Sequence, residues 1–256
     1  MSLLIPVMLF LLGAVAASFV GVVAARLNTG ASALAGRSRC DACNEELSPF
    51  SLVPIVSYCA SGGRAQCCSS LLSPSGPASE FLLGGLFVLS YLKIGFAPGL
   101  PFVLLSIALL LALVLYDLSH QILPPPLLLA FVLASAAAGA FLMPSLAEFL
   151  PALVAALLIM ASLALAHVLS RGRAMGLADA PLAFGLALLT GSAALPGFIF
   201  SFWIGALIGI IVLARRPEGS RMGVEVPFAP FLAAGFLIAY FTQWNPFALT
   251  LLIPYA

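Results

Sequence analysis

Long apolar runs fill most of this sequence, and they constrain its fold more than any other feature. Several of them approach or exceed the roughly 20 residues that a helix needs to cross the hydrocarbon core of a bilayer. Because lipid offers the backbone no hydrogen-bond partner, such runs are helical in a membrane. The chain is 63% apolar and only 7% charged, whereas about a quarter of the residues in a soluble domain are charged. The sequence therefore predicts an all-α, polytopic membrane helix bundle.

About eight transmembrane helices are expected, two of them short. The candidate spans are Leu4 to Ala25, Glu80 to Leu92, Pro101 to Leu118, Pro126 to Met143, Pro151 to Leu169, Ala180 to Gly191, Phe198 to Ala214 and Phe228 to Phe241. The sixth and seventh could instead form one long helix. Pro196 and Gly197 supply a turn between them, which favours two helices.

The distribution of basic residues also favours two helices there. With that arrangement, nine of the ten basic residues lie on one side of the membrane and only Lys93 lies on the other. The nine are Arg26, Arg37, Arg39, Arg64, Arg171, Arg173, Arg215, Arg216 and Arg221. The positive-inside rule places that side in the cytoplasm and both termini outside. No basic run is dense enough for nucleic acid, so the lipid bilayer is the expected surrounding and nucleic acid is not an expected partner.

This topology divides the chain into three parts. Residues 1–26 are expected to form the first transmembrane helix, 27–79 a cytoplasmic loop that carries all five cysteines, and 80–256 the remaining transmembrane core. The first span lacks the positive n-region of a signal peptide, since the first basic residue, Arg26, comes after the run. We therefore expect this span to be retained.

Two acidic residues lie at membrane boundaries on the expected cytoplasmic side. Asp117 ends the run IALLLALVLYD, and Asp179 opens the run DAPLAFGLALL. An acid at such a boundary is a functional candidate by default. If the two carboxylates converge, they share a proton, so that one can activate water and the other can protonate a leaving group. The pair therefore indicates peptide hydrolysis.

Two other interpretations of the acids stay open at this point. Each aspartate could cap a helix or pair with an arginine; capping suits Asp179 at a helix start but not Asp117 at a helix end, where the helix dipole is unfavourable. The same acids could also bind a cation or proton in a coupled transporter.

Five segments, in order and spacing, resemble the type IV prepilin peptidases, membrane aspartyl proteases of the G-x-G-D class. They are ASFVGVVAARL (17–27), RCDACNEELSPFSLVPIVSY (39–58), YDLSHQILP (116–124), MGLAD (175–179) and VPFAPFLAAG (226–235). The resemblance implies that residues 80–256 are an aspartyl protease core with Asp117 and Asp179 as its catalytic pair. It also implies proteolysis without a cofactor and a location in the bacterial inner membrane, with the active site on the cytoplasmic side.

The resemblance further implies a substrate and a second activity. The substrate is the leader of a type IV prepilin or pseudopilin, which links the chain to type IV pili or protein secretion. In many family members the cysteine loop is associated with methylation of the new N-terminus by S-adenosylmethionine. No glycine-rich nucleotide loop stands out in this sequence.

Two positions depart from the family pattern. The second glycine of G-x-G-D is Ala178, and Pro181 stands where lysine is frequent. Glycine permits backbone conformations that alanine adopts only at a cost. A catalytically impaired relative is therefore an alternative to an active peptidase.

The five cysteines, at positions 40, 43, 59, 67 and 68, suggest a metal site. In a reducing cytoplasm, metal ligation is favoured over disulfides, and Cys40-x-x-Cys43 is half of a zinc-ribbon pattern. The family's second pair falls on Ala65 and Cys68, so Cys67 or Cys59 would have to supply the fourth ligand. We take Cys40, Cys43, Cys68 and Cys67 as candidate ligands of a structural zinc, with a site that no longer binds metal as the alternative.

Three further polar residues are expected to have lesser roles. His120 would lie beside Asp117 if the helix continued, where it could tune the acid or simply be solvated. His167 is expected to hydrogen-bond between helices rather than to bind a ligand. Glu80 is expected to cap the second span.

Overall fold

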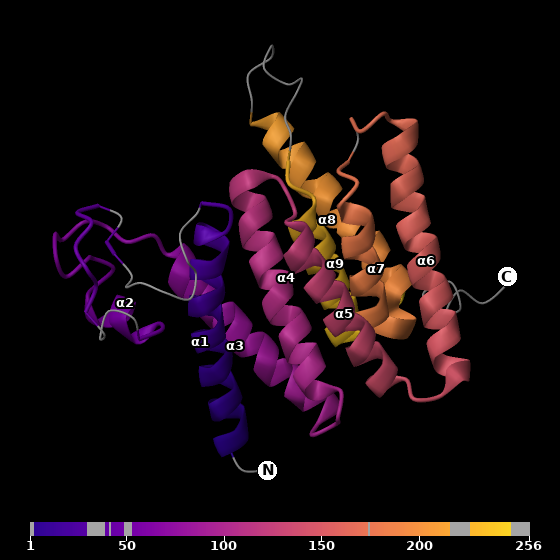
Figure 1. Cartoon of the computed structure of the whole chain (residues 1–256), viewed down its shortest axis with the longest axis horizontal. Helices are drawn as coiled ribbons and strands as arrows, with labels where there is room; N and C mark the ends of the chain where they lie inside the picture. The colour runs from indigo at the N-terminus through magenta and orange to yellow at the C-terminus, as the bar shows by residue number, and fades with distance from the viewer. Residues whose placement is uncertain are drawn as a thin grey trace, which may run out of the picture. The chain divides into compact units, whose positions relative to one another are not determined.

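A computed structural model describes residues 3–29, 39–40, 42–48, 53–173, 175–215 and 226–246. These residues form nine α-helices and one short 3-10 helix (Figure 1). The elements are α1 (Leu4–Arg26), α2 (Val56–Ala60), α3 (Ser75–Ile94), α4 (Leu100–His120), α5 (Pro125–Leu142), α6 (Leu146–Leu169), α7 (Asp179–Thr190), η2 (Gly191–Ala193), α8 (Ala194–Ala214) and α9 (Ala229–Thr242). The predicted all-α class is confirmed.

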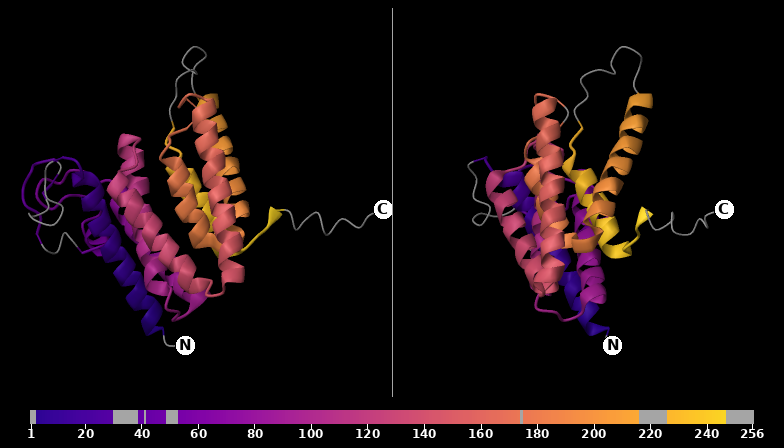
Figure 2. Two further views of the ribbon diagram at one scale, coloured as in Figure 1. Left: turned by 45° about the vertical axis from the view of Figure 1, so that its right-hand side comes forward. Right: turned by 90° about the vertical axis from the view of Figure 1, so that its right-hand side faces the viewer.

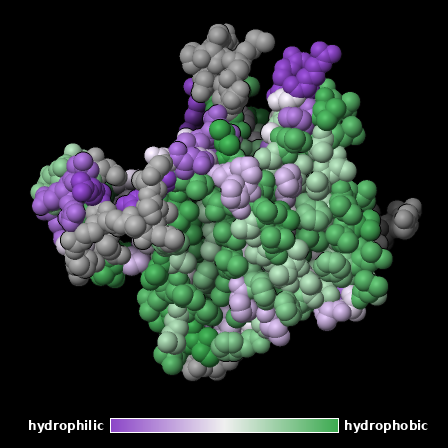
Figure 3. Space-filling view, in the orientation of Figure 1, coloured by the Kyte–Doolittle hydropathy of each residue, from purple (hydrophilic) through white to green (hydrophobic). Residues whose placement is uncertain are grey.

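Six helical stretches are long and apolar enough to cross a membrane. They are α1, α3, α4, α5, α6 and the residues Asp179–Ala214, which α7, η2 and α8 share; α9 is apolar but shorter. Figure 3 shows apolar side chains over the helices, with hydrophilic residues gathered at helix ends and in the cysteine loop. A multi-pass membrane protein is the architecture that this pattern requires.

Helix ends follow local sequence chemistry. Pro101 and Pro125 lie in the first turns of α4 and α5, where a missing N–H costs nothing because no intrahelical acceptor faces it. Ser145 caps α6, because its side chain accepts a hydrogen bond from the N–H of Glu148. Gly95 ends α3 with a φ of +65°, which glycine adopts without strain.

The second span begins earlier than predicted. The sequence places its start at Glu80, but α3 begins at Ser75. Proline is tolerated in a first helical turn, so Gly76 and Pro77 belong to the helix although their composition suggests a loop. Glu80 consequently lies inside α3 and does not cap it.

The chain divides into two compact units, Met1–Gly95 with Ile107–Leu115, and Phe96–Ser106 with Tyr116–Ala256. In the first unit α1 packs against α3. A Cβ atom on Gly13 would lie 2.7 Å from the Cα of Gly84, so the two backbones touch where both residues lack side chains. Small residues of this kind let membrane helices approach closely.

In the second unit α7 is the central helix. It contacts α5, α6, α8 and α9 (Figures 1 and 2). Ten of its 12 residues are buried, although a helix of this length is only about 18 Å long and is shorter than a bilayer core. Protein rather than lipid therefore surrounds α7.

The chain reverses direction between α7 and α8, as the charge distribution predicts. The reversal lies at Gly191, which has a φ of +60°, and at η2, and α8 then runs back past α7 (Figure 1). The predicted turn at Pro196 and Gly197 is wrong by a few residues. Both lie in the first turns of α8, where proline is tolerated and Gly197 packs against Phe236 of α9.

We expect Gly235→Ala to destabilise the second unit. A Cβ at position 235 would lie 2.6 Å from the Cα of Ser201 on α8 and would also clash with its N and Oγ atoms. Overpacking of this kind costs about 1–3 kcal/mol, measurable as a lower Tm in detergent. Gly209→Ala on α8 is the matched control, because nothing lies within 4 Å of its Cβ. Equal Tm values for the two variants would contradict the α8–α9 contact.

Candidate active site

Asp179 is the first residue of α7 and is only 7% exposed. Its Oδ2 accepts a hydrogen bond of 3.1 Å from the N–H of Gly176, while its own N–H donates to the Gly176 carbonyl. The two bonds close a short turn directly before α7. The carboxylate is therefore held in a defined orientation at the start of α7.

Asp117 lies in the last turn of α4 and is 6% exposed. Its Oδ2 accepts a hydrogen bond of 3.3 Å from the N–H of Ala229, the first residue of α9. The dipole of α4 is unfavourable for this acid, but the N-terminus of α9 provides a free N–H and a favourable partial charge. Sequence reasoning missed Ala229, which is separated from Asp117 by 112 residues.

The structure brings the two aspartates together. Both belong to the second unit, and the charge of Asp117 acts on Asp179 through a Coulombic interaction. Within the described residues, neither carboxylate pairs with a basic side chain. Two buried carboxylates in this arrangement share a proton more readily than they both ionise.

Ala178 and Pro181, the two residues that depart from the family pattern, each fit the backbone conformation at their position. Ala178 has a φ of −69° and a ψ of −18°, a conformation that alanine adopts readily. Pro181 lies in the first turn of α7, where its missing N–H has no intrahelical acceptor. Neither substitution strains the position of Asp179.

Ala178→Gly should consequently leave turnover within about twofold of wild type, since the backbone at this position does not need glycine. The measurement is the initial rate of leader cleavage at equal amounts of folded protein. A large gain in rate would show instead that alanine impairs the enzyme.

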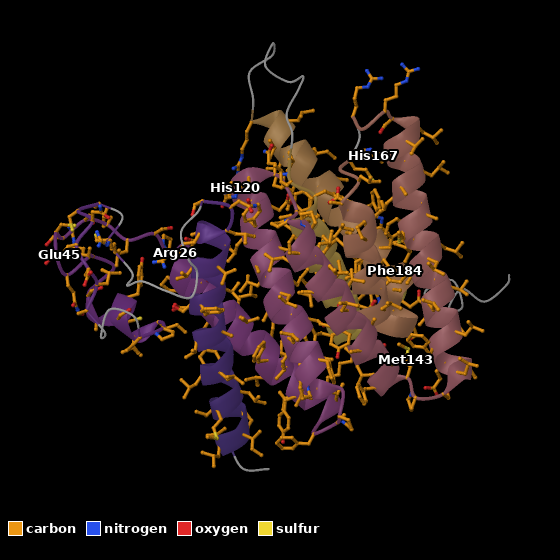
Figure 4. The ribbon with its side chains drawn as sticks, viewed as in Figure 1. Arg26, Glu45, His120, Met143, His167 and Phe184 are labelled. Carbon is orange, nitrogen blue, oxygen red and sulfur yellow. The ribbon has the colours of Figure 1, made fainter. Side chains whose placement is uncertain are left out.

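The two histidines and Glu80 make contacts that sequence reasoning did not anticipate. His120 stacks on Tyr116 with ring centroids 4.2 Å apart and directs Nδ1 to the Tyr116 carbonyl. His167, at the end of α6, hydrogen-bonds to the carbonyl of Met175 rather than to another helix (Figure 4). Glu80 Oε2 accepts a hydrogen bond of 2.7 Å from the N–H of Ile55 in the cysteine loop, so this acid anchors the loop to α3.

Four of the five cysteines form one group in the first unit. The ligand atoms of Cys40, Cys43, Cys67 and Cys68 all lie within 4.8 Å of one another. Cys43 and Cys67 are 3.3 Å apart and Cys40 and Cys68 are 3.8 Å apart, measured between Sγ atoms. Four thiolates around zinc, with Zn–S bonds of about 2.3 Å, lie about 3.8 Å apart. The donor set therefore fits a tetrahedral thiolate metal site, while Cys59 lies outside the group.

The group is built from two backbone turns of the same design. In the first turn, the N–H of Cys40 donates to the Glu45 carbonyl at 2.9 Å, and the Cys40 carbonyl accepts from the N–H of Asn44 at 2.8 Å. In the second turn, residues 64–71, the N–H of Ala65 donates to the Ser70 carbonyl and the Ala65 carbonyl accepts from the N–H of Ser69, each at 2.8 Å. An isolated β-bridge closes each turn.

Ala65 in the second turn is therefore at the position equivalent to Cys40 in the first turn. Cys68 correspondingly holds the place of Cys43. The sulfur missing at position 65 is replaced within the group by that of Cys67, next to Cys68.

The four thiols differ in acidity. Hydrogen bonds from the backbone amides of Cys43 and Ala42 lower the pKa of Cys40 to about 6. A side-chain hydrogen bond with Cys43 raises the pKa of Cys67 to about 12. Metal binding requires thiolates, so binding of an ion to this group would release protons from its thiols.

Comparison with known proteins identifies the family of the chain. Residues 11–94 match the Bacterial Peptidase A24 N-terminal domain, and residues 104–214 match the Type IV leader peptidase family. The chain belongs to the type IV leader peptidase family. The predicted family is confirmed, and it is a bacterial family of aspartic peptidases.

Curated members of the type IV leader peptidase family resemble the chain along much of its length. The prepilin leader peptidase/N-methyltransferase of Bacillus subtilis is 30% identical over 233 residues, which are 91% of this chain and 92% of that protein. The protein of the same name from Pseudomonas aeruginosa is 32% identical over 79% of this chain and 70% of its own length. The one from Myxococcus xanthus is 32% identical over 82% and 64%. No solved structure matches the chain.

Proposed function

We propose that this protein is a prepilin leader peptidase with Asp117 and Asp179 as its catalytic pair. One observation carries the proposal: two buried carboxylates, from α4 and α7, interact with each other, and each is held through Oδ2 by a backbone amide. Similarity to peptidases over most of the chain supports the reaction. The expected substrates are type IV prepilins or pseudopilins.

The two side chains divide the proton transfers between them. The ionised carboxylate takes a proton from water as the water oxygen attacks the scissile carbonyl, and the protonated carboxyl donates a proton to the leaving amide nitrogen. Bond formation to water and cleavage of the C–N bond leave one proton on the pair, so the shared-proton state is regenerated. The amides of Gly176 and Ala229 orient Oδ2 of each acid and leave the Oδ1 atoms available for proton exchange.

The site is proposed to face the cytoplasm of the bacterial cell. Arg171 and Arg173 follow α6, and Arg215 follows α8; α6 ends on the side where α7 begins. Basic residues accumulate at cytoplasmic helix ends, so Asp179 lies at the cytoplasmic boundary in this topology. A prepilin leader precedes a hydrophobic segment, which can lie along the bundle and bring the scissile bond to the carboxylates.

The cysteine group is proposed to hold a structural zinc. Cys40, Cys43, Cys67 and Cys68 would be its ligands, and the ion would stabilise the loop between α1 and α3. Methylation of the new N-terminus by S-adenosylmethionine is proposed as a second activity, because the curated relatives carry that name.

The test is cleavage of a prepilin-like peptide by the purified protein, followed by mass measurement of the product. The mass reports the cut site and N-terminal methylation together. A cut directly before the hydrophobic segment is expected. Ion or proton flux into proteoliposomes without any cleavage would instead favour a transporter.

A further inference from the structure

The segment that joins α6 to α7 contains one peptide group that is hydrogen-bonded on both sides. The carbonyl of Met175 lies 2.9 Å from Nδ1 of His167. The N–H of Gly176, which belongs to the same peptide group, donates to Oδ2 of Asp179 at 3.1 Å. A single planar unit therefore connects the imidazole at the end of α6 to the carboxylate at the start of α7.

The hydrogen-bond partner of His167 determines which of its ring nitrogens carries a hydrogen. A carbonyl oxygen can only accept, so Nδ1 carries the hydrogen and donates it to Met175. Hydrogen bonds in series polarise one another. The bond from His167 consequently makes the N–H of Gly176 a better donor to Asp179, and it fixes the plane in which that N–H points.

The imidazole is itself held in place by the end of α6. Gly172 has a φ of +76°, and its N–H donates to the His167 carbonyl at 2.8 Å. A Cβ atom at Gly172 would lie 3.3 Å from Cε1 of His167, so the ring packs directly on this glycine. Figure 4 shows His167 where the chain leaves α6 for this segment.

We propose that His167 is a positioning residue for Asp179 and acts through the peptide group of Met175 and Gly176. The role rests on the proposed function, since it matters only if Asp179 exchanges protons. His167 contacts neither Asp179 nor Asp117 directly in the described hydrogen bonds. Its effect is on the orientation of Oδ2, and a misplacement of about 1 Å at a reacting group can cost about a hundredfold in rate.

Two substitutions at position 167 test the proposal. His167→Leu removes the donor, whereas His167→Asn keeps an N–H at nearly the position of Nδ1. We expect His167→Leu to lower kcat by about tenfold to a hundredfold while KM stays within about threefold, and His167→Asn to recover kcat to within about threefold of wild type. Ser162→Ala is the control, because it removes another side-chain hydrogen bond from α6, that of Ser162 Oγ to the Ile159 carbonyl, and should leave kcat and KM unchanged.

The outcomes separate the inference from the proposed function. Wild-type kcat in His167→Leu, or equal losses in the Leu and Asn variants, would overturn the positioning role. A parallel fall in kcat and Tm that asparagine does not correct would assign a purely structural role and overturn it as well. If the wild-type protein cleaves no leader peptide, the proposed function fails and the role of His167 fails with it. If wild type cleaves the peptide and Asp179→Asn does not, the proposed function stands whatever the His167 variants show.

Discussion

Asp117→Asn and Asp179→Asn should each lower the rate of leader cleavage by about a thousandfold or more. Asparagine has the shape of aspartate, and its Oδ1 can still accept the N–H of Ala229 or Gly176. The variant side chain can neither take a proton from water nor give one to the leaving nitrogen at neutral pH. The fold and the helix-end hydrogen bonds are thus retained while the proton chemistry is lost.

The rates are measured on purified variants in detergent, with Tm as the check on folding. Glu148→Gln is the matched control, since Glu148 is an exposed acid in the first turn of α6 and its charge should not affect turnover. Asp117→Ala and Asp179→Ala should also abolish cleavage and leave membrane insertion intact. Turnover near the wild-type rate in a folded variant of either aspartate would rule out the pair as the catalytic acids.

Loss of one ligand from the cysteine group should remove the zinc that we propose it holds. We expect about one zinc ion per wild-type chain and close to none in Cys40→Ser, because a tetrahedral structural site needs all four ligands. Elemental analysis of the purified protein measures this ratio. Cys59→Ser should retain the ion, because Cys59 lies outside the group.

The duplicated turn allows a rescue of this loss. Cys67→Ala should lose zinc, and adding Ala65→Cys to it should restore zinc, since position 65 has the backbone place of Cys40. Retention of zinc in Cys67→Ala alone would exclude Cys67 as the fourth ligand. Failure of the double variant to bind zinc would mean that the backbone similarity of the two turns does not extend to their side chains.

Hydropathy and charge predicted most of the fold because membrane helices follow rules that act along the chain. Run length identifies a span, and arginine position orients it. Local rules failed where packing decides the outcome. The chain reverses at Gly191, before Pro196, because Pro196 fits the first turn of α8. Helix α3 likewise includes Pro77, because that proline fits its first turn.

The candidate site was predictable in its residues but not in its contacts. Family resemblance pointed to Asp117 and Asp179, and no local signal in the sequence connects Asp117 to Ala229. The same holds for the cysteines. The first C-x-x-C is readable from spacing, whereas the choice of Cys67 over Cys59 depends on how two separate turns meet in space.

The burial of α7 limits which substitutions this protein can accept. Ala183 and Ala187 are fully buried, and a Cβ on Gly185 would lie 2.6 Å from the ring of Phe131. A larger side chain at any of these positions has no lipid to move into, because four helices surround α7. Variants that accept a different leader are therefore to be sought on the surrounding helices, whose outer faces can be altered, while the helix that begins with Asp179 has almost no room for variation.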